Sequence, residues 1–195
     1  MKNQDTGEDT TVVRLIYAGD PGKKDLLNGL LLALKDVNFS ANKFELNIVG
    51  VAAGTFSDLY FNGGSLPVYI KCHGRVPMEK VPEYYSLCDF SVLIRENKRY
   101  AHAGFPTKLV ESFMAKVPII TNLTSDIGEY VKSGYNGFII DGPSKDSILE
   151  CLVKISQIDP IQIKELKENA YKTALNSFSY TAYTKSLPAY FDKLQ

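Results

Sequence analysis

The chain has 195 residues, 45% of them apolar, which suffices for one domain with a sizeable hydrophobic core. Its 22 basic and 22 acidic residues cancel, so composition gives no reason to expect binding to nucleic acid. No apolar run reaches the roughly 18 residues of a membrane span, and the polar N-terminus lacks the apolar core of a signal peptide. These features predict a cytoplasmic protein without a transmembrane segment.

The three cysteines, Cys72, Cys88 and Cys151, are odd in number, widely spaced and flanked by apolar residues. This pattern is typical of reduced thiols in or near a core rather than of a disulfide framework or a metal site. We therefore expect no metal site in this chain.

Apolar strands and amphipathic helices alternate from residue 12 onward. Strands are expected at residues 12–19, 44–50, 67–74, 89–94, 117–120 and 137–141. Helices are expected at residues 23–34, 56–61, 77–87, 108–116, 126–134, 145–157, 160–176 and 181–194. The chain thus divides into a disordered or foreign tail at 1–11, one α/β domain at 12–179 and a C-terminal helical segment at 180–195.

The alternation predicts the fold class. Continuous apolar strands that end in glycine and alternate with helices indicate a parallel sheet covered on both faces. The expected topology is a Rossmann-like, doubly wound sheet of six strands in the order 3-2-1-4-5-6, which binds ligands at the carboxyl ends of its strands. Residues 19–24, 74–77 and 95–111 should then surround one crevice.

The most informative stretch is GFPTKLVESFMAKVPIITN, residues 104–122. Its helix carries one apolar stripe at helical spacing, with Glu111 to the side of it. The stripe comprises Leu109, Val110, Phe113, Met114 and Val117. Thr107 is the expected N-cap, and a capped helix start presents free N–H groups to an anion. We therefore expect a phosphate at this helix end, with the Glu111 carboxylate near ribose hydroxyls.

Two basic segments lie near the same crevice. Gly19-Asp20-Pro21-Gly22-Lys23-Lys24 follows the first strand, and its glycines and lysines could meet a diphosphate at a helix start. Its spacing fits neither the dinucleotide fingerprint nor the P-loop, and a turn with solvated lysines is the alternative. The loop at 95–103, which contains Arg99, leaves the same alternatives open, a phosphate clamp or a solvated loop.

These segments, in their order, resemble the donor-binding domain of GT-B glycosyltransferases, in particular the retaining family 4 group (glycosyl transferases group 1). Members of that group carry a glutamate, seven residues, a second glutamate and then a proline-led apolar strand. Glu111 aligns with the second glutamate, and residues 117–120 align with the strand. Ala103 stands where the first glutamate is expected. The resemblance extends over residues 12–179.

The resemblance implies a donor substrate, a nucleotide-diphosphate sugar of the UDP or GDP type, with no separate cofactor. The residues that it implies in donor binding are Gly19, Lys23, Lys24, Val76, Arg99, Thr107, Lys108, Leu109, Val110 and Glu111. Lys24 would stabilise the leaving diphosphate and Glu111 would orient the ribose, so these two are the expected catalytic residues. The nucleotide base would pack at Val76, through its backbone.

The resemblance also implies that this domain is one half of a transferase. The acceptor-binding N-terminal domain is not in the chain, so the isolated domain is expected to be inactive. The helix in 180–195 would pack on that missing domain, and alone its apolar surface could produce a homodimer. The implied reaction transfers a hexose-type sugar with retention, in polysaccharide or glycan synthesis, with the enzyme at the inner face of a membrane as one location.

Two alternatives stay open. A sugar-nucleotide epimerase shares the architecture, although it also needs residues from two domains. A non-catalytic nucleotide- or sugar-binding module would use the same crevice, and Ala103 in place of the first motif glutamate favours it.

Overall fold

The computed structural model describes residues 12–21, 24–40 and 43–184. The predicted tail, Lys23 and most of the predicted C-terminal helix lie outside the described residues. In chain order the elements are β1 (Val13–Ala18), α1 (Asn28–Val37), β2 (Phe44–Val49), α2 (Ala53–Phe61), β3 (Ile70–Cys72), η1 (Met78–Lys80), α3 (Val81–Ser86), β4 (Phe90–Leu93), α4 (Arg99–His102), α5 (Thr107–Met114), β5 (Ile119–Asn122), α6 (Ile127–Tyr130), β6 (Gly137–Ile140), α7 (Lys145–Ile155), α8 (Pro160–Ser177) and η2 (Tyr180–Ala182), where η marks a 3₁₀ helix.

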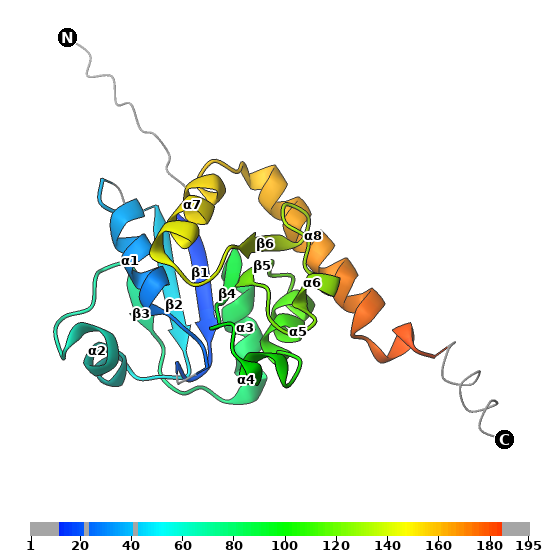
Figure 1. The fold of residues 1–195 in the computed structure, drawn as a ribbon, viewed down its shortest axis with the longest axis horizontal. Helices are drawn as coiled ribbons and strands as arrows, with labels where there is room; N and C mark the ends of the chain where they lie inside the picture. Colours follow the sequence, from blue (N-terminus) through cyan, green and yellow to red (C-terminus); the bar gives the residue numbers. More distant parts are fainter. Residues whose placement is uncertain (1–11, 22–23, 41–42, 185–195) are drawn as a thin grey trace, which may run out of the picture.

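The strands form one parallel sheet in the order β3-β2-β1-β4-β5-β6, which confirms the predicted topology (Figure 1). β1 pairs with β2 along its full length and with β4 on its other side, where Leu15 lies opposite Phe90. The connections reverse direction between β1 and β4. In doubly wound sheets, the carboxyl edge at this reversal is where ligands bind.

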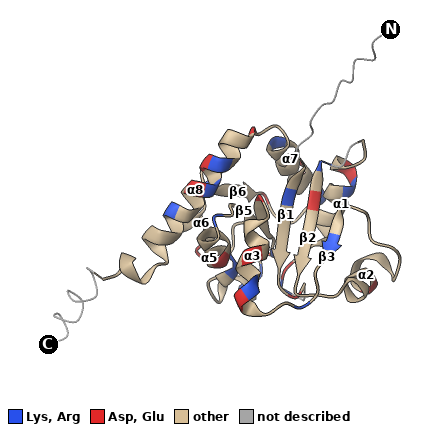
Figure 2. Cartoon of the chain, turned by 180° about the vertical axis from the view of Figure 1, so that it is seen from behind, with Lys and Arg blue, Asp and Glu red and all other residues tan. Residues whose placement is uncertain are grey.

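Helices cover both faces of the sheet. Successive side chains of the central strand point to opposite faces, so each face has an apolar core of its own. Leu15 and Tyr17 pack with α1, α2 and α7, whereas Ile16 and Ala18 pack with α3. On the α3 side, α5, α6 and α8 pack over β4 and β5. Figures 1 and 2 show these layers from opposite sides, and Figure 2 shows basic and acidic residues interspersed along α8.

The first helix begins later than predicted, at Asn28 instead of residue 23. Asp25 forms an antiparallel bridge with Arg95, and the Leu26 N–H donates to the Ile94 carbonyl oxygen at 2.8 Å. These contacts with the chain that follows β4 hold residues 24–26 in an extended path. Lys24 consequently lies in an exposed turn and not at a helix start.

Other element boundaries also differ from the prediction. The third strand is limited to Ile70–Cys72, because only these residues pair with β2. The helix predicted at 126–134 is shorter, since α6 spans Ile127–Tyr130 and the chain is extended at Val131. The loop expected at 95–103 contains a short helix, α4.

The cysteines behave as core residues. Cys88 and Cys151 are buried and Cys72 is half-buried, and all three are free thiols. Burial raises the pKa of the Cys88 and Cys151 thiols to about 12, so both stay protonated at neutral pH.

Among the described helices, none combines the length and apolar character that a bilayer span requires.

Candidate functional site

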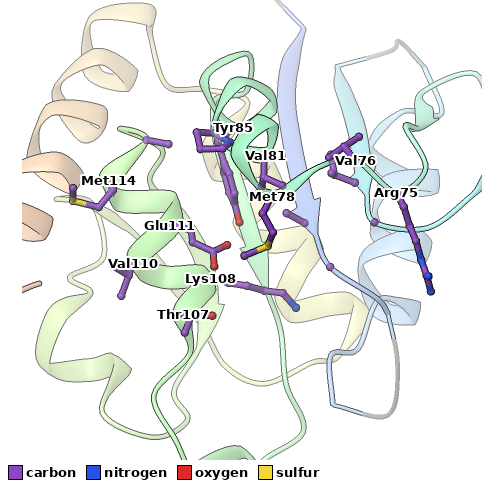
Figure 3. A pocket seen from close by; sticks show the side chains of 16 residues that line it. Arg75, Val76, Met78, Val81, Tyr85, Thr107, Lys108, Val110, Glu111 and Met114 are labelled. Carbon is purple, nitrogen blue, oxygen red and sulfur yellow. The ribbon is translucent and has the colours of Figure 1, made fainter.

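A pocket of about 680 Å³ opens at the carboxyl edge of the sheet, between α3 and α5 (Figure 3). Its lining is mostly apolar, with a few polar groups from α5. The lining residues are Ala18, Gly19, Val49, Gly50, Arg75, Val76, Met78, Val81, Pro82, Tyr85, Thr107, Lys108, Val110, Glu111, Met114 and Ala115. This size and this mixture are typical of sites for small organic ligands.

Two glycines form the floor of this pocket. Their φ angles, +147° at Gly19 and +117° at Gly50, are ones that other residues rarely adopt. A side chain at Gly50 would meet the Gly19 carbonyl oxygen at 2.6 Å, and one at Gly19 would meet Lys108 Nζ at 2.7 Å. The absence of side chains here therefore lets Lys108 lie across the end of β1.

The helix start that faces the pocket differs in detail from the prediction. The N-cap is Pro106, and Thr107 is the first helical residue, not the cap. Proline has no polar side chain with which to cap a helix, and the first N–H groups of a helix lack intrahelical partners. The start of α5, at Thr107 and Lys108, is therefore open to an anion, as expected from the sequence, but without a side-chain cap.

The apolar stripe of α5 serves two surfaces. Leu109, Phe113 and Val117 are buried in the core. Val110 is half-buried and Met114 is 45% exposed, and both line the pocket. The predicted apolar stripe therefore does not lie against the core throughout, because Val110 and Met114 form a wall of the pocket.

Glu111 projects from α5 into this apolar setting. Its side chain is exposed, and Figure 3 shows its carboxylate next to the hydroxyl end of Tyr85. Burial and the nearby Glu111 charge raise the pKa of Tyr85, which therefore stays neutral. A carboxylate at the mouth of an apolar slot is well suited to accept hydrogen bonds from sugar hydroxyls. Arg75 also lines the pocket, but Figure 3 shows its side chain pointing away from Glu111.

A buried charge cluster lies beside the pocket. Asp25 is 5% exposed and accepts hydrogen bonds from Arg95 Nε at 2.9 Å, from the Tyr17 hydroxyl at 2.9 Å and from Lys108 Nζ. Burial alone would raise the pKa of Asp25, but these three donors outweigh it and hold that pKa below its ordinary value. Burial and the Asp25 charge raise the pKa of Tyr17. This cluster was not predicted from the sequence, because its members lie up to 91 positions apart.

A second, smaller pocket of about 240 Å³ adjoins the first and shares Thr107 with it. Its lining residues are Lys24, Arg95, Tyr100, Ala101, Ala103, Gly104, Phe105, Pro106 and Thr107. None of these described lining residues is acidic. Ala103, where a glutamate was expected, is exposed at this pocket.

The structure brings together most of the predicted site residues. Those that line the first pocket are Gly19, Val76, Thr107, Lys108, Val110 and Glu111. Lys24 lines the second pocket instead. Arg99 lines neither of the two and is exposed at the start of α4, while the Leu109 side chain is buried in the core. Met78 and Tyr85 line the first pocket but were not predicted, since their apolar spacing resembles that of ordinary core residues.

Comparison with known sequences gives one match and one negative result. A sequence model of the family Glycosyl transferases group 1 matches residues 2–173. No curated protein sequence matches the chain.

Solved structures share the fold. Sucrose-phosphate synthase from Thermosynechococcus elongatus is 15% identical, with a TM-score of 0.75 over 95% of this chain and 46% of that one. The C-terminal domain of a group 1 family glycosyl transferase from Francisella tularensis is 16% identical, with a TM-score of 0.68 and 87% of each chain covered. HepE from Anabaena, in complex with UDP and glucose, is 16% identical, with a TM-score of 0.66 over 93% of this chain and 48% of that one.

These likenesses confirm the predicted fold class, a Rossmann-like domain of GT-B glycosyltransferases. The chain spans about half the length of the synthase and of HepE. At identities this low the likeness concerns the fold alone.

Proposed function

This chain belongs to the glycosyl transferases group 1 family, and on that premise we propose that its first pocket binds the nucleotide of a sugar donor. The domain would be the donor-binding half of a glycosyltransferase. The observation that supports this most strongly is the grouping of three features in one pocket, namely an apolar slot, the Glu111 carboxylate and the open, lysine-bearing start of α5.

Each feature matches one part of a nucleoside diphosphate. The apolar side chains of Met78, Val81 and Tyr85 suit a flat base, with Val76 at the strand end beside it. Glu111, one turn into α5, would accept hydrogen bonds from ribose hydroxyls. The helix start and Lys108 would hold the diphosphate, because both favour negative charge.

The basic groups near the diphosphate would also promote cleavage of the sugar–phosphate bond. Cleavage of the sugar–phosphate bond develops negative charge on the leaving diphosphate, and preformed positive groups at that place lower the barrier. Lys108, Lys24 and the α5 N–H groups would supply this stabilisation. We propose Lys24 for the leaving group and Glu111 for orientation of the ribose, with net retention at the anomeric carbon, as in the resembled group.

The remaining parts of the proposal concern the whole enzyme. The donor would be a UDP or GDP hexose, and HepE, a structural neighbour, is described in complex with UDP and glucose. The acceptor would bind to an N-terminal domain outside this chain. The full enzyme would act in the cytoplasm, in polysaccharide or glycan synthesis.

A second candidate function is a nucleotide-binding module without transferase activity. It is favoured by Ala103 and by the lack of acids among the described lining residues of the second pocket.

Titration calorimetry with UDP, GDP and ADP tests the proposal. One diphosphate should bind, and Glu111→Ala should weaken it about tenfold or more, the cost of losing charged hydrogen bonds. Lys24→Ala should weaken it by a smaller factor. Glu165→Ala and Lys164→Ala, at exposed positions on α8, are matched controls that should leave affinity unchanged. A folded domain that binds none of the three would contradict the proposal.

Turnover separates the two candidate functions. In the full-length protein, slow hydrolysis of the donor sugar would favour the transferase. Nucleotide binding with no turnover would favour the module.

A further inference from the structure

The two pockets are joined by a single buried carboxylate. Asp25 Oδ1 accepts from Arg95, which lines the second pocket, and Asp25 Oδ2 accepts from Lys108, which lines the first. The Tyr17 hydroxyl donates to the same Oδ2 at 2.9 Å, and the Lys108 ammonium lies 4.7 Å from the centre of the Tyr17 ring. Asp25 thus ties one cation to each pocket.

Both cations keep hydrogen-bonding capacity beyond these contacts. An ammonium has three N–H donors, and Lys108 directs two of them to Asp25 and to the Tyr17 oxygen at 3.4 Å. A guanidinium has five, and Arg95 directs its Nε–H to Asp25. The side chains of Lys108 and Arg95 are 21% and 15% exposed, so each can still reach a ligand.

We propose that Asp25 is a positioning residue, which aims Lys108 and Arg95 from opposite sides at a diphosphate that bridges the two pockets at Thr107. This inference rests on the proposed nucleotide-binding function. It assigns Arg95, rather than exposed Arg99, as the phosphate-binding residue of the loop after β4. Tyr17 supports the arrangement by donating to Asp25.

A simpler role for Asp25 makes the opposite prediction. The cluster of Asp25, Lys108 and Arg95 has a net charge of +1, and removal of the carboxylate would raise it to +2. If Asp25 only neutralised the cations, its removal would strengthen the binding of a diphosphate. If Asp25 positions them, its removal lets both side chains rotate into solvent, and binding weakens.

The test compares Asp25→Asn with wild type in titrations of UDP and GDP and of the nucleosides uridine and guanosine. The proposal predicts about tenfold weaker binding of the diphosphate, the cost of a misplaced charged hydrogen bond, with nucleoside affinity unchanged. Asp36→Asn, which removes a carboxylate from an exposed pair with Lys145, is the matched control and should alter neither.

Tyr17→Phe is the second variant, because it removes a donor to Asp25 without changing charge. It should also weaken the diphosphate selectively, by a smaller factor, so the proposal stays testable if Asp25→Asn fails to fold.

Unchanged or tighter diphosphate binding in a folded variant would overturn the positioning role, as would equal weakening of diphosphate and nucleoside. In either case wild-type binding would leave the proposed function intact. Wild-type protein that binds none of UDP, GDP and ADP would overturn both.

Discussion

Substitution of Asp25 by asparagine should also lower the stability of the folded domain. Loss of one partner from a fully buried ion pair costs about 3–5 kcal/mol. Asp25 is 5% exposed, but Lys108 and Arg95 are 21% and 15% exposed and regain part of their hydration. We therefore expect the free energy of unfolding at neutral pH to fall by about 2–3 kcal/mol, below the stability of a typical domain, so the variant should still fold.

The loss should depend on pH in a defined direction. The pKa of Asp25 is lower in the folded protein than its ordinary value of 3.8. A lowered folded pKa contributes stability that is fully present above the unfolded pKa and is lost as the pH falls through the folded pKa. The difference between wild type and Asp25→Asn should therefore be constant well above about pH 4 and should shrink below it.

Urea unfolding followed by circular dichroism measures this difference, since the chain has no tryptophan for fluorescence. Asp36→Asn serves again as the control and should cost at most about 1 kcal/mol, because its ion pair is on the surface. A loss for Asp25→Asn below about 0.5 kcal/mol at neutral pH would mean that Asp25 does not stabilise the fold through its ion pairs. So would a stability difference between the two proteins that does not shrink on acidification.

Three further substitutions have definite expected outcomes. Gly29→Ala, normally favourable in a helix, should lower the urea midpoint, because its Cβ would lie 2.3 Å from the Pro143 carbonyl oxygen. Ser112→Ala should cost about 1–2 kcal/mol in urea unfolding, because its buried hydroxyl donates to the Val117 carbonyl. Met78→Ser, at an 82% exposed side chain of the first pocket, should weaken UDP about fivefold in calorimetry without changing the urea midpoint.

The opposite result for each substitution would have a specific structural meaning. A stabilised Gly29→Ala variant would mean that α1 lies farther from the turn at Pro143. A neutral Ser112→Ala would mean that the Val117 carbonyl finds another donor. Unchanged UDP affinity in Met78→Ser would remove this residue from the base site.

The topology was predictable because its signals are local. In a parallel sheet buried on both faces, each strand is a continuous apolar run, and such runs alternate with amphipathic helices here. The positions of the two proposed binding segments, Gly19 and Thr107–Glu111, follow from that topology, because they come after strands that flank the reversal of the sheet.

The charge cluster was not predictable in the same way. Lys24-Asp25 before an apolar helix looks like a helix start, yet Asp25 pairs with Arg95, 70 positions away, and with Lys108, 83 positions away. Such contacts depend on how the loops after β1 and β4 pack against each other. No local sequence pattern predicts this packing.

Helical periodicity also cannot distinguish residues that pack in the core from residues that line the pocket. Leu109 and Met114 belong to one apolar stripe, but the first is fully buried and the second is 45% exposed beside the pocket. Both surfaces are apolar, so hydrophobicity alone assigns them to the same face.

The proposed nucleotide site is the pocket between α3 and α5. Chemical-shift mapping by NMR, with the labelled domain titrated with UDP and GDP, locates the bound nucleotide. We expect the largest shifts at Gly19, Val76 and the backbone of Thr107–Glu111. Shifts confined elsewhere, for example to the apolar groove of Leu31, Tyr60 and Tyr69 between α1 and α2, would contradict it.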